Sequence, residues 1–310
     1  MKLYIEAKQY PWVTWGNQMW KVSRQIKDKE LEVVADPDEA DTLLIEWDEV
    51  LQSSDLQTRK PTWIFVESID SHLVPIFVDF VKNNKDVVGV LSQSYYMYEL
   101  LSDKGIKVFI WDLPTRVQPS LWYKGGEEVL EKNGDFVIVS NATRYPDNIA
   151  EVVKTYFAMY MRQGEDEEKI PDHNLDIYSA YEMPFETFNN VRFNGLQSNL
   201  LVHRKIKKSK LFISPYNGNG VPLSVVDAVF LGTPILVRDT EANRAIVPWG
   251  KNFFREKEDL AKVLKYYMDI PISSEEYRTS IEENFARFVV DFSPDRCYTK
   301  LKNILIGDAT

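Results

Sequence analysis

Short apolar runs alternate with amphipathic stretches over the first part of the chain. Between several of these runs lie segments with helical periodicity, such as residues 73–84 and 94–105, the second of which ends at Gly105. The runs themselves have the length and the apolar or alternating character of β-strands, and they cover residues 2–7, 41–47, 62–68, 86–92 and 107–112. Alternation of strands with helices predicts a parallel sheet with helices packed on it.

A second series of the same kind follows a change in composition. Residues 122–135 are rich in glycine and charge, which is typical of a connection between domains. After them, strand-like runs again alternate with helical stretches, and the last third of the chain is helical. We therefore expect two doubly wound α/β domains facing each other across a cleft, the first in residues 1–121 and the second in residues 136–289.

The composition indicates a soluble globular protein. The chain has 310 residues, of which 44% are hydrophobic and 27% charged, and this length suits two domains. The first residues lack the apolar core of a signal peptide, and no run approaches the roughly 18 apolar residues of a membrane span. The single cysteine, Cys297, allows no intramolecular disulfide. We expect a cytoplasmic protein.

The charges and the histidines bear on the kinds of ligand. A net charge of −10 opposes broad binding to nucleic acid, which requires clustered lysine and arginine. The three histidines, His72, His173 and His203, lie far apart in the sequence, so we expect no Cys/His metal site. The one dense basic run, residues 203–210, is either a solvated helix face or a contact with an anionic substrate or membrane surface. Peripheral membrane contact through this run stays open.

Candidate chemistry concentrates in the segment NGNGVPLSVVDAVF, residues 217–230. A strand-like run ends just before it, its Asn-Gly steps suit a loop, and Pro222 fits the first turn of a helix. The free N–H groups at such a helix start favour an anion such as a phosphate. These groups belong to Gly220, Val221, Leu223 and Ser224.

An acid stands within the apolar part of the same helix. Asp227 has valine, alanine and phenylalanine as neighbours, and an unpaired buried carboxylate is costly. The carboxylate could therefore accept hydrogen bonds from a ligand with paired hydroxyls, such as a ribose. The alternative is a half-exposed helix residue capped by Ser224.

This segment resembles the sugar-nucleotide motif of retaining glycosyltransferases of the GT-B fold, the family 4-like enzymes also called glycosyl transferases group 1. That motif reads Glu-Gly-x-Pro-x-x-x-x-Glu-Ala-x-x-x-Gly-x-Pro, and the chain has Asn219-Gly220-Val221-Pro222, then Asp227-Ala228, then Gly232-Thr233-Pro234. The resemblance extends to residues 86–114, 190–215 and 292–305, and is weakest over residues 8–85. It implies two Rossmann-like domains, an N-terminal acceptor domain and a C-terminal sugar-nucleotide domain, with a final helix at about residues 290–310 packing back on the first domain.

The resemblance also implies roles for residues of the second domain. Asp227 matches the acid that holds the nucleotide ribose, and Asn219 matches the acid that contacts the donor sugar. The amides from Gly220 onward would face the diphosphate. Both positions differ from the family, which has glutamate at each of them.

Further donor contacts follow from the same resemblance. Gly16 matches an early glycine near the donor phosphates, and the base would be held near Asn190, Val191 and Arg192. Arg144 is the only basic residue where the family has an arginine and a lysine after the first strand of the second domain.

The activity that the resemblance implies is transfer of a hexose from a nucleoside-diphosphate sugar, with retention, to a carbohydrate, lipid or protein acceptor. Helix amides and Arg144 would stabilise charge on the leaving diphosphate, so we expect no cofactor and no required metal. In the first domain, Asp70 and His72 follow a strand and are candidates for a general base or a positioning role, the alternative being loop capping.

Two other classes compete with this interpretation. A noncatalytic sugar-nucleotide or glycan-binding subunit would keep the fold and tolerate loss of the first acid at residue 219. A nicotinamide-dependent dehydrogenase would share the sheet, but no G-x-G-x-x-G follows any strand-like run in this chain.

Overall fold

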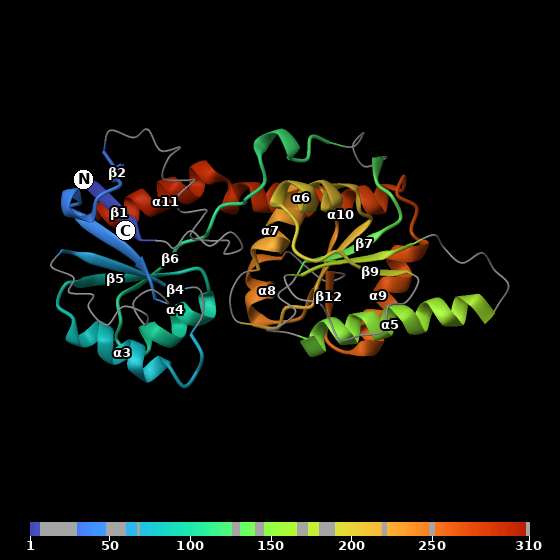
Figure 1. Cartoon of the computed structure of the whole chain (residues 1–310), viewed down its shortest axis with the longest axis horizontal. Coiled ribbons are helices and arrows are strands. Elements are labelled where there is room, and N and C mark those ends of the chain that lie inside the picture. The colour runs from blue at the N-terminus through green and yellow to red at the C-terminus, as the bar shows by residue number, and fades with distance from the viewer. Residues whose placement is uncertain are drawn as a thin grey trace. The chain divides into compact units, whose positions relative to one another are not determined.

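Two parallel β-sheets organise the part of the chain that the structure describes, each with six strands (Figure 1). The structure is a computed structural model of the 310-residue chain, and it describes residues 1–6, 30–47, 60–66, 69–125, 131–139, 146–165, 173–179, 190–218, 222–247 and 252–307. Each sheet belongs to a separate unit. Met1–Pro114 and Asp291–Thr310 form the first, and Thr115–Gly218 and Pro222–Val290 form the second. The predicted fold class, two Rossmann-like α/β domains, is confirmed.

The first sheet has the strand order β2-β1-β3-β4-β5-β6. Its strands are β1 (Lys2–Glu6), β2 (Glu32–Val34), β3 (Thr42–Glu46), β4 (Thr62–Val66), β5 (Val87–Ser92) and β6 (Val108–Ile110). The short helix η1 (Pro37–Glu39) leads into β3, and the longer helices of this unit are α3 (Val74–Asn83), α4 (Tyr95–Ser102) and α11 (Pro294–Ile306).

Helices cover both faces of the first sheet. Phe77 of α3 and Met97 of α4 are buried in one core with Val90 of β5. Figure 1 shows α3 and α4 on one side of this sheet and α11 on the other. The buried Trp111 just after β6 donates its indole N–H to the carbonyl of Cys297 in α11, at 2.8 Å. The last helix thus belongs to the first unit.

The second sheet has the strand order β12-β11-β10-β7-β8-β9. Its strands are β7 (Phe136–Val139), β8 (Leu175–Tyr178), β9 (Val191–Phe193), β10 (Leu211–Ser214), β11 (Ile235–Arg238) and β12 (Phe253–Phe254). Its helices are η2 (Pro119–Leu121), α5 (Pro146–Glu165), α6 (Asn199–Lys208), α7 (Leu223–Phe230), α8 (Glu241–Ile246), α9 (Lys257–Asp269) and α10 (Glu275–Phe292). Counted within the unit, this is the 3-2-1-4-5-6 order of dinucleotide-binding sheets.

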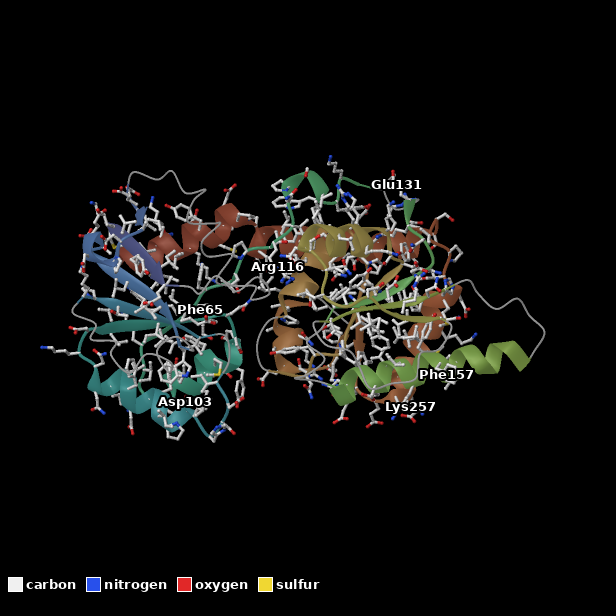
Figure 2. All side chains as sticks on the ribbon, in the orientation of Figure 1. Phe65, Asp103, Arg116, Glu131, Phe157 and Lys257 are labelled. Atoms are coloured by element: carbon white, nitrogen blue, oxygen red, sulfur yellow. The ribbon has the colours of Figure 1, made fainter. Side chains whose placement is uncertain are left out.

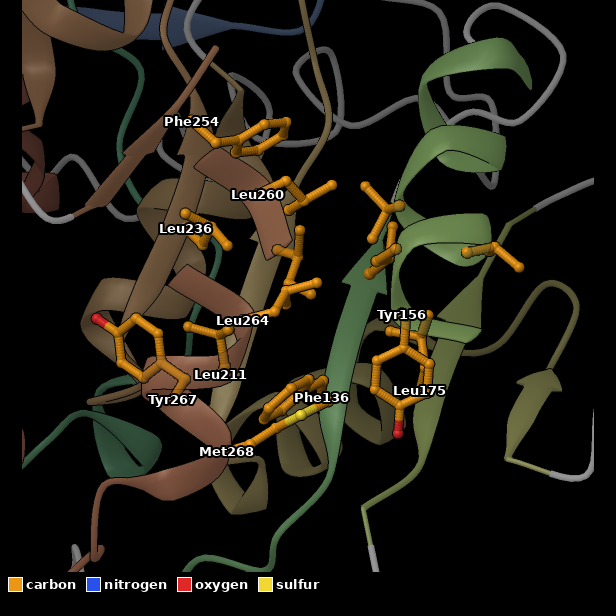
Figure 3. Packing of buried hydrophobic residues seen from close by; sticks show 14 of the residues in the cluster. Phe136, Tyr156, Leu175, Leu211, Leu236, Phe254, Leu260, Leu264, Tyr267 and Met268 are labelled. Atoms are coloured by element: carbon orange, nitrogen blue, oxygen red, sulfur yellow. The ribbon is translucent and has the colours of Figure 1, made fainter. Parts of the chain in front are cut away.

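The core of the second unit lies between its sheet and helices α5 and α9. Figure 3 shows Phe136 and Leu211 of the sheet packed with Tyr156 of α5 and Leu264 of α9. All four are buried, and apolar burial of this kind stabilises a domain by about 25 cal/mol for each Å² removed from water. The sheet and both helices therefore share one hydrophobic core.

The chain enters the second unit earlier than the predicted connection at residues 122–135. The change of unit falls between Pro114 and Thr115. Residues 115–123, which we call the entry segment, lie against α6 and α7. Lys207 Nζ donates to the carbonyl of Leu121 at 3.0 Å, and Tyr123 N donates to the carbonyl of Phe230 at 2.8 Å. This part of the chain is held by the second unit.

Candidate functional site

The strand order of the second sheet indicates a ligand site at the carboxyl ends of its strands. From β7 the chain proceeds outward through β8 and β9, and then returns to β10 on the other side of β7. Ligands of such sheets bind at the carboxyl ends of the strands where the order reverses, which here means the loops after β7 and β10. Of the predicted site residues in or near these loops, Arg144, Asn219, Gly220 and Val221 lie outside the described residues, as does Gly16 after β1.

The helix after β10 begins as the sequence predicts. The loop of residues 215–218 follows Ser214, and α7 has Pro222 as its N-terminal cap. Val225 N donates to the carbonyl of Pro222 at 2.9 Å, whereas the first N–H groups of a helix have no partner within it. Leu223 and Ser224 contribute these groups. Their predicted contact with a phosphate stays a prediction.

A glycine closes the same helix for a steric reason. Gly232, the glycine of the motif's Gly-x-Pro, has φ of +68°, and a β-carbon placed on it would lie 2.4 Å from Tyr123 Cδ2. Its N–H donates to the carbonyl of Val229 at 2.9 Å, and Thr233 N donates to that of Ala228 at 3.0 Å. Glycine is the residue that tolerates this left-handed conformation. The entry segment therefore packs directly on the end of α7.

Asp227, on α7, is fully buried and fully engaged. Its Oδ1 accepts from Thr115 Oγ1 at 3.1 Å and from Arg116 N at 2.9 Å. Its Oδ2 accepts from Arg116 Nε at 2.6 Å and lies 2.5 Å from Arg116 Nη2, and His203 Nε2 of α6 is 3.3 Å away. Arg116 is labelled in Figure 2. The alternative of a half-exposed helix residue is wrong, because Asp227 forms a buried ion pair.

This environment keeps the carboxylate charged. Burial by itself raises the pKa of Asp227, but the Arg116 guanidinium and the hydrogen bonds from His203 and Arg116 outweigh it and lower the pKa to about 2. The carboxylate is therefore ionised at neutral pH. A carboxylate offers about four lone-pair positions, so ribose hydroxyls could reach Asp227 only by displacing one of its present donors. The ribose contact stays a prediction.

No feature of the sequence identified Thr115 and Arg116 as partners of this acid. They lie 112 and 111 residues before it in the chain. The apolar run around Asp227 indicated only that a buried carboxylate there needs a partner, such as a cation, from another part of the chain. Which of the chain's 37 lysines and arginines supplied it could not be read from local spacing.

Two of the residues predicted near the base, Asn190 and Val191, lie at the amino ends of the strands of this sheet. β9 begins at Val191, which is in register with Leu175, the first residue of β8. The carbonyl of Asn190, just before it, accepts from Leu175 N at 2.7 Å. All strands of this sheet run parallel. Asn190 and Val191 are therefore at the amino ends of the strands, whereas the loop of residues 215–218 follows the carboxyl end of β10. The structure does not bring them beside that loop.

Arg192 is occupied in a cross-strand ion pair. Its Nε donates to Asp176 Oδ1 at 2.8 Å, its Nη2 donates to Asp176 Oδ2 at 2.9 Å, and the same Nη2 reaches Asp135 Oδ2 at 3.2 Å. The side chain of Arg192 is 44% exposed, whereas that of Asp176 is 2% exposed. These contacts give Arg192 a structural role within the sheet. Its contact with a nucleotide base stays a prediction.

Asp70 and His72 lie in the first unit, between β4 and α3. Both are exposed, and they stand at the carboxyl edge of the first sheet. The carbonyl of Asp70 accepts from Leu73 N at 2.8 Å, and Leu73, the N-cap of α3, makes no side-chain capping bond. Exposure at the carboxyl ends of the strands is compatible with the predicted general-base or positioning role. The general-base role stays a prediction.

The basic run of residues 203–210 is divided between the interior and the surface. His203 and Lys210 are buried, and Lys210 Nζ donates to the carbonyl of Met268 at 2.9 Å. Lys205 and Lys207 reach partners in their own unit. The remaining cations, at residues 204 and 208, are exposed on α6, which favours a solvated helix face.

Two further properties bear on cofactors and membranes. Within the described ranges, no three His, Cys, Asp or Glu side chains are grouped so that they could hold a metal ion. Among the helices in those ranges, none is long and apolar enough to cross a membrane.

Comparison with known proteins finds similarity in structure and not in sequence. No family model matches the chain, and no curated protein matches it. Anabaena HepE in complex with UDP and glucose superposes with a TM-score of 0.71 over 99% of both chains, at 10% identity. Sucrose-phosphate synthase from Thermosynechococcus elongatus has a TM-score of 0.67 over 99% of both chains, at 11% identity.

A third solved structure agrees with these two. A UDP-forming α,α-trehalose-phosphate synthase from Burkholderia vietnamiensis has a TM-score of 0.61 at 11% identity, over 86% of this chain and 73% of the synthase. At such low identities the similarity concerns the fold alone. The chain has the two-domain GT-B fold.

Proposed function

We propose that this protein is a glycosyltransferase of the hexosyltransferase type, which moves a sugar from a nucleoside-diphosphate sugar to an acceptor with retention of configuration. The observation that carries the proposal is the GT-B fold over 99% of the chain, shared with a protein solved with UDP and glucose. The sheet order of the second unit supports it, because ligands of such sheets bind at the carboxyl ends of the strands where the order reverses, and in this unit those strands are β7 and β10.

The donor would bind at the loop after β10 and the start of α7. The N–H groups of Leu223 and Ser224, with those of Gly220 and Val221 in the sequence before them, would face the diphosphate. Arg144 is the cation that the sequence offers near the same edge, after β7. Together they would stabilise the charge that develops on the leaving diphosphate, so the proposed reaction requires no metal.

The acceptor would be a carbohydrate, lipid or protein group with a free hydroxyl. The first unit presents Asp70 and His72 on the turn after β4, where either could position that hydroxyl or accept its proton. Asn219 would position the donor sugar through its amide, which accepts and donates hydrogen bonds but carries no charge.

A second candidate is a noncatalytic subunit that binds a sugar nucleotide or a glycan. The observations that favour it are the asparagine at residue 219 and the engagement of Asp227 by Arg116. Such a subunit would bind the donor without breaking it.

A nucleotide screen by thermal shift tests the donor part of the proposal. UDP, ADP and GDP are compared with the corresponding nucleosides and with inorganic pyrophosphate, each at saturating concentration. One diphosphate should raise the melting temperature while its nucleoside does not, because a ligand that binds only the folded state stabilises it. Equal melting temperatures with the whole panel would refute nucleotide binding.

A further inference from the structure

A buried ionic network connects three segments of the second unit that are distant in sequence. Its centre is Asp227 of α7, which pairs with Arg116 of the entry segment and lies beside His203 of α6. The side chains of Arg116 and His203 are 12% and 5% exposed, and that of Asp227 is not exposed at all. The network is thus part of the interior.

Both carboxylate oxygens of Asp227 are already engaged, and Oδ2 also lies 3.3 Å from His203 Nε2. Oδ1 accepts from Thr115 Oγ1 and from the backbone N–H of Arg116, while Oδ2 accepts from Nε of the same arginine and lies at bonding distance from its Nη2. These donors use the roughly four lone-pair positions of a carboxylate. The arginine presents its planar fork together with its own main chain, so the pair fixes the backbone of the entry segment as well as a side chain.

The entry segment continues along the same two helices. The carbonyl of Leu121 accepts from Lys207 of α6 at 3.0 Å. The ring of Trp122 lies 4.9 Å from that of Phe230 on α7, and Tyr123 N donates to the carbonyl of Phe230. Asp227 is therefore the first of a row of contacts that hold residues 115–123 on α6 and α7.

A ribose is a poor competitor for this carboxylate. Its hydroxyls are neutral donors, whereas the guanidinium is charged, and charge-assisted hydrogen bonds are about twice as strong as neutral ones. Removing one partner of a buried ion pair leaves the other charge uncompensated, which is strongly unfavourable. Exchange of Arg116 for ribose hydroxyls would incur this cost, because the neutral hydroxyls would not replace the positive charge of the guanidinium.

We propose that Asp227 anchors the entry segment to α7, and that the nucleotide site therefore binds the ribose without the carboxylate of Asp227. The second part rests on the proposed function. Its consequence is weak discrimination between a nucleoside diphosphate and its 2′-deoxy counterpart. The acid at this position of the motif is a structural residue in this chain.

Calorimetric titration of the parent protein tests the consequence. The ligands are UDP, ADP and GDP, each paired with its 2′-deoxy form. The dissociation constants within the pair that binds should agree to within about twofold. A carboxylate that held the 2′-hydroxyl would give a preference of about tenfold or more for the ribonucleotide. A hydrogen bond to a charged group contributes enough binding free energy to change the dissociation constant by about that factor. Such a preference would overturn the proposal.

Hydrogen exchange tests the anchor without any nucleotide, so failure of the proposed function is distinguishable from failure of this inference. In Asp227→Asn, amides of residues 115–123 should exchange faster than in the parent. The matched control is Asp176→Asn, because Asp176 is also buried and also pairs with an arginine through both oxygens, but at the amino edge of the sheet. The control should leave residues 115–123 unchanged.

A milder variant covers the case in which Asp227→Asn does not fold. Arg116→Lys keeps the positive charge but loses the two-pronged contact, and it should raise exchange in the same residues to a smaller extent. Parent-like exchange of residues 115–123 in the folded variants, or the same increase in Asp176→Asn, would overturn the anchoring role.

Discussion

Replacing Asp227 with asparagine should lower the free energy of unfolding by about 3–5 kcal/mol, the range measured when one partner of a buried ion pair is removed. The amide keeps the size of the side chain but loses the charge that balances Arg116 in the interior. The amide also places an NH₂ group, which is a donor, at one of the two oxygen positions. At one position it would face Thr115 Oγ1 and Arg116 N, and at the other it would face the guanidinium, all of which are donors too.

The lowered pKa of Asp227 corresponds to a free energy of the same order. A fall from 3.8 to about 2 means that the folded state favours the ionised form by on the order of 2 kcal/mol, even after burial has opposed it. This is a lower figure than the mutational one because it leaves out the unbalanced guanidinium in the variant. Both figures exceed the change expected at an exposed ion pair, about 0–1 kcal/mol.

Urea denaturation at pH 7 followed by far-UV circular dichroism provides the assay, with Asp176→Asn as the control. The control should lose less stability, because its partner Arg192 is 44% exposed and is solvated by water when the acid is lost. An unfolding free energy for Asp227→Asn within about 1 kcal/mol of the parent, at equal m-value, would refute the reasoning.

Three further predictions concern the same unit. Between about pH 4 and pH 2 the stability difference between the parent and Asp227→Asn should shrink. The pKa of Asp227 is lower in the folded state than in the unfolded state, so its contribution to stability is lost as the pH falls through that window. Urea midpoints measured at each pH check this. Gly232→Ala should cost more than about 2 kcal/mol in urea denaturation, since φ is +68° and the added β-carbon would meet the ring of Tyr123, and an unchanged midpoint would contradict it. Lys132→Met should lower the free energy of unfolding by about 3 kcal/mol, because Lys132 Nζ donates to the carbonyls of Lys207 and Ser209 and to Thr233 Oγ1. A thermal melt equal to that of the parent would argue against this prediction.

Periodicity was sufficient for the layers of the fold. The runs at residues 62–68 and 86–92 appear as β4 and β5, and the helical pattern that ends at Gly105 appears as α4. Central parallel strands are buried on both faces, so they read as continuous apolar runs. β2 was missed, because an edge strand of three residues with an exposed glutamate leaves no such run.

The site was predictable only in part. The motif around α7 was visible because its spacing is local: a proline cap, a buried acid and a left-handed glycine within 11 residues of one another in the sequence. The partner of the acid was not visible, since the choice of Arg116 depends on how the chain enters the second unit. The basic run of residues 203–210 was predictable in part: its exposed residues fit the solvated helix face, but the burial of Lys210, whose Nζ donates to the carbonyl of Met268, depends on tertiary packing.

Donor turnover measures the central claim most directly. Purified protein is incubated with UDP-glucose, ADP-glucose and GDP-mannose, with and without simple sugar acceptors, and release of the nucleoside diphosphate is followed. Proton NMR then gives the anomeric configuration of the released or transferred sugar. The account predicts diphosphate release from one donor, with the α-configuration retained, and a larger loss of turnover than of nucleotide affinity in Asn219→Ala. Tight nucleotide binding with no release from any donor, in the parent and in Asn219→Glu alike, would contradict it and identify a binding subunit.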